Sequence, residues 1–112
     1  MAAMRWWGWG HDGVAFTHED KPALGPFLLR HLGLDVEQVT SRPGAFEDLK
    51  LPEPSLPPGL RAALEAALGG GFVSTDPLDR LVHARGKSLR DLVRHRRGET
   101  GRLPDVVVRP GD

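Results

Sequence analysis

Glycine and proline limit how this chain can fold more than any apolar pattern does. The 112 residues include 14 glycines and 10 prolines, more than a fifth of the sequence, and these residues separate the apolar segments without forming a repeat. Because proline interrupts a helix and glycine commonly ends one, each regular element must be short. Residues 40–59 contain five prolines and two glycines, which predicts an extended connector with local turns.

Two helices are predicted on either side of this connector. Residues 18–34 have a proline near the start, apolar side chains at helical spacing and Gly33 at the end. Residues 57–71 combine strong helix formers with a terminal run of three glycines. The expected apolar faces are Leu24, Phe27, Leu28 and Leu32 in the first helix and Leu60, Leu64, Ala67 and Leu68 in the second.

Two further short helices are predicted from their capping residues. Thr75 or Asp76 can cap a helix that has Pro77 in its first turn and ends at Gly86, and Ser88 can cap the helix that follows. We expect Leu78, Leu81 and Val82 of the third helix and Leu89, Leu92 and Val93 of the fourth to be buried, with Arg90, Arg94, Arg96 and Arg97 facing water and Gly98 ending the element.

Three consecutive valines at 106–108 are typical of a strand that is buried on both faces. Such a strand needs neighbours in a sheet, and the sequence offers none within reach. We therefore expect a mainly α fold class with two parts. Residues 1–103 form a small helical region of about four short helices and a proline-rich connector, and residues 104–112 form the first strand of a missing α+β domain, so that the chain is a fragment.

Composition excludes several classes of protein. The chain has no cysteine, which excludes disulfides, thiolate metal sites and a cysteine nucleophile and is consistent with a cytoplasmic location. No apolar run approaches the roughly 20 residues needed to span a bilayer, and the start of the sequence does not resemble a signal peptide. The length of 112 residues predicts one small domain with a modest core.

The motifs that suggest chemistry have simpler explanations. Gly86, Lys87 and Ser88 resemble the end of a phosphate-binding loop, but Leu81 stands where that loop requires glycine, so we interpret them as a helix stop and a helix cap. The glycine run at 69–71 follows a helix and is interpreted as its terminus. The five histidines, His11, His18, His31, His83 and His95, lack the spacing of a metal site and are expected at the surface or its boundary.

A basic stretch lies near the end of the sequence. Between residues 80 and 97 there are six arginines and one lysine against a single acid, Asp91. Such a cluster can bind phosphate groups or nucleic acid. No aromatic residue is interleaved for base stacking and the whole chain is neutral, so nucleic acid is the weaker hypothesis and a solvated or acid-binding helix face the stronger one.

The tryptophans are confined to one short stretch, "RWWGWG", at residues 5–10. Trp6, Trp7 and Trp9 could form an exposed platform for a ligand or could dock into a larger body, each burying on the order of 200 Å². We favour docking, because exposed apolar patches of that size normally mark a contact surface.

Three motifs, taken together, resemble the N-terminal region of FAD-linked oxidases of the alkylglycerone-phosphate synthase (alkyl-dihydroxyacetonephosphate synthase) family, which are flavoproteins of the vanillyl-alcohol oxidase type. The first is a basic-Trp-x-Gly-Trp-Gly opening, matched by Arg5, Trp6, Gly8, Trp9 and Gly10. The second is matched by Asp79, Arg80, His83, Ala84 and Gly86, and the third, the "PDxVxxP" of the first flavin-domain strand, by Pro104, Asp105, Val106 or Val107, and Pro110.

The resemblance implies that the chemistry lies outside this sequence. In the family, the glycine-rich loop that binds the FAD pyrophosphate comes after this strand, the catalytic tyrosine and histidines come later still, and this sequence contains no tyrosine. We therefore assign no catalytic, cofactor-binding or metal-binding residue here. FAD is expected in the full-length relative, with an ether-lipid precursor or another oxidisable substrate.

Two functions remain open from the sequence. The chain is expected to be the N-terminal part of such an FAD-dependent oxidoreductase, with a structural role and with the missing flavin and substrate domains as its partners, and the full-length enzyme is a possible homodimer. Alternatively, it is a free-standing interaction module whose basic helix binds nucleic acid or an acidic protein.

Overall fold

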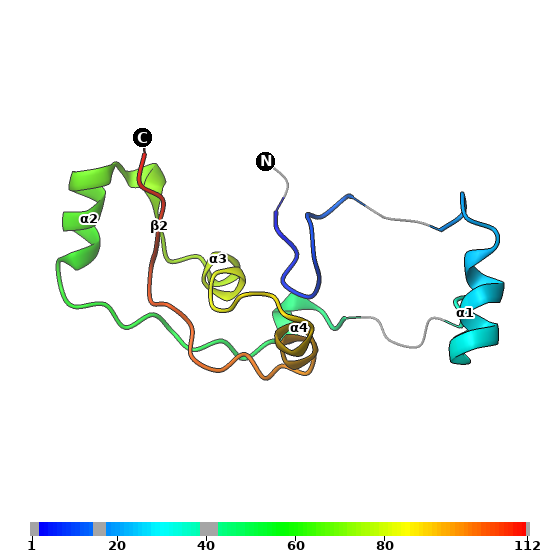
Figure 1. Cartoon of the computed structure of the whole chain (residues 1–112). Coiled ribbons are helices and arrows are strands. Elements are labelled where there is room, and N and C mark those ends of the chain that lie inside the picture. Colours follow the sequence, from blue (N-terminus) through cyan, green and yellow to red (C-terminus); the bar gives the residue numbers. More distant parts are fainter. Residues whose placement is uncertain (1–2, 15–17, 39–42, 112) are drawn as a thin grey trace.

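The computed structural model of the chain describes residues 3–14, 18–38 and 43–111. Within these residues the structure is mainly helical with a short two-stranded sheet, which confirms the predicted fold class. The elements in chain order, drawn in Figure 1, are α1 (Leu24–Leu32), the 3-10 helix η1 (Phe46–Asp48), α2 (Leu60–Leu68), the 3-10 helix η2 (Gly70–Phe72), β1 (Val73–Ser74), α3 (Pro77–Val82), α4 (Leu89–Arg96) and β2 (Val107–Val108).

Local capping explains where α3 and α4 begin. The Asp76 side chain accepts a hydrogen bond from the Asp79 amide at 3.0 Å, and Pro77 occupies the first turn, as predicted. Ser88 and Asp91 form a reciprocal capping box at the start of α4. The predicted end of the third helix at Gly86 is wrong, because α3 stops at Val82 and residues 83–87 form a loop.

Only part of the predicted inner face of α4 is buried. Leu92 is buried as expected, but Leu89 is 66% exposed and Val93 39% exposed. The second buried residue of α4 is His95, at 3% exposure, so its predicted place at the surface or its boundary is also wrong. The helix therefore packs through Leu92 and His95, while a Leu89–Val93 ridge faces outward.

The predicted isolation of the valine strand is wrong as well. Val107–Val108 pairs antiparallel with Val73–Ser74, in the register Val73 to Val108 and Ser74 to Val107. The Arg109 amide extends this pairing by donating to the Phe72 carbonyl at 2.8 Å. The first strand was missed because two residues next to a glycine run give almost no periodic signal.

The core is small and draws on distant parts of the sequence. Trp6, Leu81 and Leu103 form its buried centre. The partly buried apolar residues that pack around this centre are Trp7, Phe46, Leu49, Leu51, Leu78, Val82 and Ala84. The proline-rich connector crosses this core, and its residues 40–42 lie outside the described residues.

The molecule is longer and more exposed than a closed domain of its mass. Its radius of gyration is 18.5 Å and its dimensions are 59 × 30 × 20 Å, whereas a compact domain of this length has a radius of gyration of about 13 Å. Its accessible surface is 8417 Å², and a compact protein of 12.2 kDa exposes about 6,000 Å². Figure 1 shows α1 at one end and α2 with the sheet at the other.

Candidate docking interface

The tryptophan stretch forms a tight hairpin-like loop. Met4 and His11 form an antiparallel bridge. Within it, the Arg5 amide donates to the Gly10 carbonyl at 3.0 Å. Gly10 has a φ of 80°, a conformation that favours glycine. The loop is therefore closed by hydrogen bonds of its own backbone.

The three tryptophans lie in three different environments. Trp6 is buried in the chain's own core against Leu81 and Leu103, so the expectation of an external socket does not hold for this residue. Trp7 is half-buried, and two guanidinium groups contact its ring, with the Arg5 and Arg96 Cζ atoms 4.9 and 5.4 Å from the ring centroid. Trp9 is 60% exposed. Its docking role remains a prediction.

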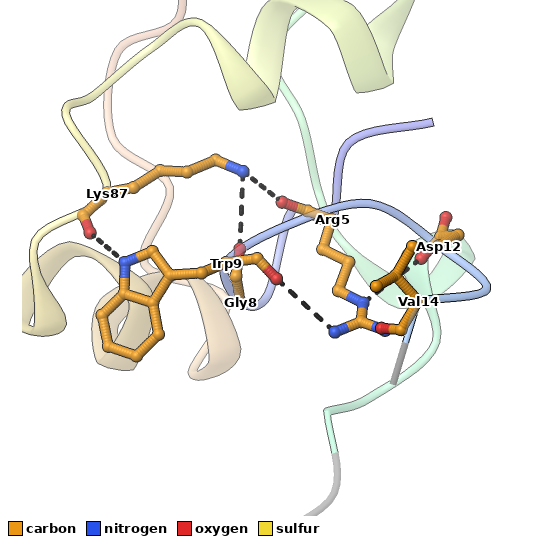
Figure 2. A network of polar contacts seen from close by, with 6 residues as sticks. All are labelled: Arg5, Gly8, Trp9, Asp12, Val14 and Lys87. Atoms are coloured by element: carbon orange, nitrogen blue, oxygen red, sulfur yellow. Dashed lines mark hydrogen bonds and ion pairs between the residues drawn. The ribbon is translucent and has the colours of Figure 1, made fainter. Parts of the chain in front are cut away.

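Lys87 holds the loop against the rest of the protein, as Figure 2 shows. Its Nζ donates to the Arg5 carbonyl at 2.6 Å and lies 3.4 Å from the Gly8 carbonyl, while the Trp9 Nε1 donates to the Lys87 carbonyl at 3.0 Å. Burial lowers the pKa of the Lys87 amino group. The residue has a φ of 53°, rare for a side chain other than glycine.

Figure 2 also shows that the Arg5 side chain connects residues within and just after the tryptophan loop. Its guanidinium donates to the carbonyls of Val14 and Trp9, the latter at 3.5 Å, and its Nε lies 3.9 Å from the Asp12 carboxylate. The interpretation of Ser88 in the motif "GKS" as a helix cap is confirmed by its capping box with Asp91. The anchoring role of Lys87 was missed, since its partners are about 80 positions away.

His95 lies next to the same loop. It is buried, and its Nε2 has no hydrogen-bond partner among the described residues. Burial lowers the pKa of its imidazole, and a hydrogen bond to the Trp6 backbone opposes this effect. One signal could have indicated its burial, since His95 follows Leu92 by three positions on the face that α4 buries.

The second and third motifs meet in space. Arg80 is 2% exposed and its Nε donates to the Pro104 carbonyl at 2.7 Å, so it does not belong to the solvated basic face predicted for residues 80–97. Asp79 accepts a hydrogen bond from Arg109 Nη2 at 2.6 Å, which is the largest cause lowering the pKa of this carboxyl. The Ser55 amide donates to Asp105 at 2.9 Å. The first two contacts join α3 to residues on either side of β2, and the third joins the proline-rich connector to the segment before β2.

The remaining motif residues have few contacts. Gly86 and Pro110 are exposed, and His83 is exposed with its Nδ1 2.7 Å from the Asp79 carbonyl oxygen. Gly8 is buried within the hairpin-like loop. The structure thus brings the three motifs into one body around Trp6 and Leu81, but it groups none of them as a catalytic set.

Shallow hollows flank the exposed ridge of α4. One, of about 310 Å³, is lined by Arg5, Trp7, Gly8, Trp9, Leu89, Leu92, Val93 and Arg96. The other, of about 590 Å³, is lined by Leu89, Arg90, Val93, Arg94, Arg97 and Glu99. Both combine an apolar floor with guanidinium groups at the rim, which suits an apolar partner with acidic surroundings.

Among the described residues, neither the glycine run nor the histidine and acidic side chains form a recognisable site for a pyrophosphate or a metal ion. The glycine run closes α2 and continues into η2, so its amides do not form the cradle for a pyrophosphate that precedes a helix. Over residues 3–14, 18–38 and 43–111, no three His, Asp or Glu side chains are grouped to hold a metal. In the same ranges, no helix is long and apolar enough to cross a membrane.

Known proteins resemble this chain over nearly its whole length. Alkyldihydroxyacetonephosphate synthases of Trypanosoma brucei brucei and Dictyostelium discoideum are each 29% identical to it, over 97% and 96% of the chain. Solved structures of alkyldihydroxyacetonephosphate synthase superpose with TM-scores of 0.73 and 0.74 at 25% identity, covering 94% of the chain. The chain spans about a fifth of the length of these synthases: 21% of each of the two relatives and 23% and 22% of the solved chains.

A shorter relative is also present. Protein Rv2250A of Mycobacterium tuberculosis is 32% identical over 99% of this chain, and the match covers 72% of that protein. No protein-family model matches the sequence. From the identity and the coverage shared with Rv2250A, we conclude that the chain belongs to the same protein family as Rv2250A and is similar in sequence and structure to a segment of alkyldihydroxyacetonephosphate synthase.

Proposed function

We propose that this chain is a docking segment of an FAD-dependent oxidoreductase similar to alkyldihydroxyacetonephosphate synthase, and that its own role is structural. The observation that carries the proposal is the combination of shape and likeness. The chain is elongated, at 59 Å, yet its course follows a segment of a synthase more than four times as long with a TM-score of 0.73. A shape that buries so little of its own surface is best explained by contacts with the remainder of such an enzyme.

The sheet end of the molecule is the proposed contact with the flavin domain. Leu60 of α2, Phe72 of η2 and Val108 of β2 are all large apolar residues that are at least 38% exposed. The contacts of α2 with η2 and β1, and of β1 with β2, gather these elements at one end (Figure 1). Both strands also have an open edge in this two-stranded sheet, so further strands can add to it.

The chemistry is proposed to reside in the remainder. FAD would supply the redox step there, with an ether-lipid precursor or another oxidisable substrate beside it. This chain would contribute the packed body around Trp6, Leu81 and Leu103 and hold the entrance to β2 in place through Arg80, which binds the Pro104 carbonyl.

A chimera tests this proposal. The matching segment of the Dictyostelium discoideum synthase is replaced by this chain, and a second version simply lacks the segment. We expect the chimera to retain stoichiometric flavin absorbance and the shortened version to lose it. Equal flavin content in both versions, or loss of flavin from both, would contradict the proposal.

A variant locates the contact. Phe72→Asp at the sheet end should lower the thermal midpoint of the chimera by several degrees, because it places a charge in the proposed interface. The same substitution should change the isolated chain little, since Phe72 is 43% exposed there. Equal effects in both settings would show that Phe72 serves only this chain's own fold.

A further inference from the structure

Two neighbouring residues of α3 hold the chain on both sides of β2. The Arg80 Nε donates to the carbonyl of Pro104, which precedes the strand, at 2.7 Å. The Asp79 carboxylate accepts from Nη2 of Arg109, the residue directly after the strand, at 2.6 Å. We refer to these two contacts as the α3 clamp. Because its two points lie on either side of β2, the clamp fixes the strand relative to α3.

The pairing of β2 with β1 is too short to fix the strand by itself. Within the described residues, Val107–Val108 pairs only with Val73–Ser74, and a sheet of two strands is at best marginally stable alone. Val107 is buried, but Val108 is 39% exposed. The position of β2 therefore depends on the side chains that reach it from α3 as well as on the sheet.

The contact between Asp79 and Arg109 belongs to a network. An exposed ion pair contributes little by itself. The Asp79 side chain, however, is only 28% exposed, and its pKa is lowered chiefly by Arg109 and less by a hydrogen bond from Ser74 of β1. The backbone amide of Arg109 donates to the Phe72 carbonyl at 2.8 Å. Arg109 thus extends the sheet through its backbone and reaches α3 through its side chain.

We propose that Asp79, Arg80 and Arg109 are positioning residues, which hold β2 and its open edge at the place where a flavin domain joins the sheet. This inference rests on the proposed docking of the sheet end. The three residues would act through the strand, by setting the place at which a further strand adds to β2, and not by touching the flavin. Networks of hydrogen bonds and rigid elements are the structures through which distant sites are coupled.

Arg109→Gln tests the clamp in the full chain. It removes the cation that Asp79 holds but keeps the backbone amide that pairs with Phe72. Hydrogen exchange at this amide and those of β2 should become about tenfold faster, the effect of losing a hydrogen bond between charged groups, while the amides of α4 should be unchanged. Arg109→Lys keeps the cation and should restore most of the protection.

The synthase chimera tests what the clamp does for the flavin. There, Arg109→Gln should weaken FAD binding about tenfold, and Arg109→Lys should recover most of the affinity. Ser88→Ala is the matched control, because it lowers stability at the start of α4 and leaves the sheet end unchanged. It should leave FAD affinity unchanged. Titration of the flavin-free chimera with FAD, followed by flavin fluorescence, measures the affinity, and the thermal midpoint measures stability in parallel.

Three outcomes would overturn the positioning role. These are β2 amides that are unprotected in the wild-type chain, exchange at β2 that Arg109→Gln does not change, and FAD affinity that falls equally in Arg109→Gln and Ser88→Ala, and so follows stability alone. A wild-type chimera that holds no flavin would instead contradict the docking proposal, and the flavin role of the clamp with it. Hydrogen exchange in the full chain still shows in that case whether the clamp fixes β2.

Discussion

The body of the molecule and the α1 arm both contain helices with a clear apolar pattern, but only the body buries its apolar side chains within this chain. The body, residues 3–14 and 43–111, buries Trp6, Leu81 and Leu103 and is fastened by the Lys87 and Arg80 side chains. The arm, residues 18–38, has an equally clear apolar pattern, yet buries no residue of its helix. An amphipathic helix is therefore no evidence of a core unless another element of the same chain supplies its partner.

The largest difference in stability between the two regions is expected when a large apolar side chain is shortened in each. Leu81 is completely buried, and Leu81→Ala is expected to lower the free energy of unfolding by about 2–5 kcal/mol. Leu32→Ala in the arm, at 63% exposure, should change it by less than about 0.5 kcal/mol. Urea unfolding followed by far-UV circular dichroism measures both. Similar losses would mean that the arm is packed as tightly as the body.

The next largest effect is expected at Lys87. Lys87→Met removes the donor to the Arg5 and Gly8 carbonyls and should cost about 1.5–3 kcal/mol, the range for hydrogen bonds that involve a charged group. The freed loop should shift tryptophan emission to longer wavelength as Trp6 gains solvent. Lys50→Met is the control, because Lys50 is exposed. An unchanged emission spectrum would show that the loop is held by Trp6 packing alone.

The start of α4 and the contacts of the tryptophan loop show which features can be predicted from sequence and which cannot. The start of α4 was predictable because Ser88 and Asp91 are three positions apart and cap the helix by themselves. The roles of Lys87 and His95 were not, because each depends on a loop about 80 or more positions away. The same reason explains Val73, whose strand is defined only by its pairing with Val108.

The resemblance to synthases could be predicted because it was argued from motifs, and motifs can be recognised in a sequence without knowing which residues are in contact. Their placement was not, since Asp79 and Arg80 of the second motif meet Arg109 and Pro104 of the third only in the folded chain. The exposure of Leu89 and Val93 was missed because the apolar pattern of α4 was interpreted as a face covered by this chain. Apolar spacing reports that a face is to be covered, but does not say by which chain.

A smaller effect is expected at the start of α4. Ser88→Ala removes the side-chain half of the capping box and should cost about 1 kcal/mol. Ser55→Ala is a matched control, because Ser55 donates through its backbone amide to Asp105 and this bond survives the substitution. Chemical unfolding measures the difference between the two variants. No difference would mean that tertiary contacts, and not the cap, fix the start of the helix.

The smallest effect is a dependence of stability on pH that belongs to the body alone. Because burial lowers the pKa of His95, the unfolded chain takes up a proton at higher pH than the folded chain does. The free energy of unfolding should thus be constant above about pH 7 and should fall as the pH drops below the ordinary histidine pKa of about 6.5.

Arg85, Lys87 and Asp91 are the charged groups that act on His95, and the two cations reinforce the effect of burial while Asp91 and the Trp6 backbone oppose it. His95→Gln keeps a polar side chain that cannot be protonated in this range, so it should flatten the dependence between pH 7 and 5. The exposed His31 of the arm provides the control, and His31→Gln should leave the slope unchanged. A slope that persists without His95 would place the titrating group elsewhere and would show that the imidazole next to the tryptophan loop does not cause the dependence of stability on pH.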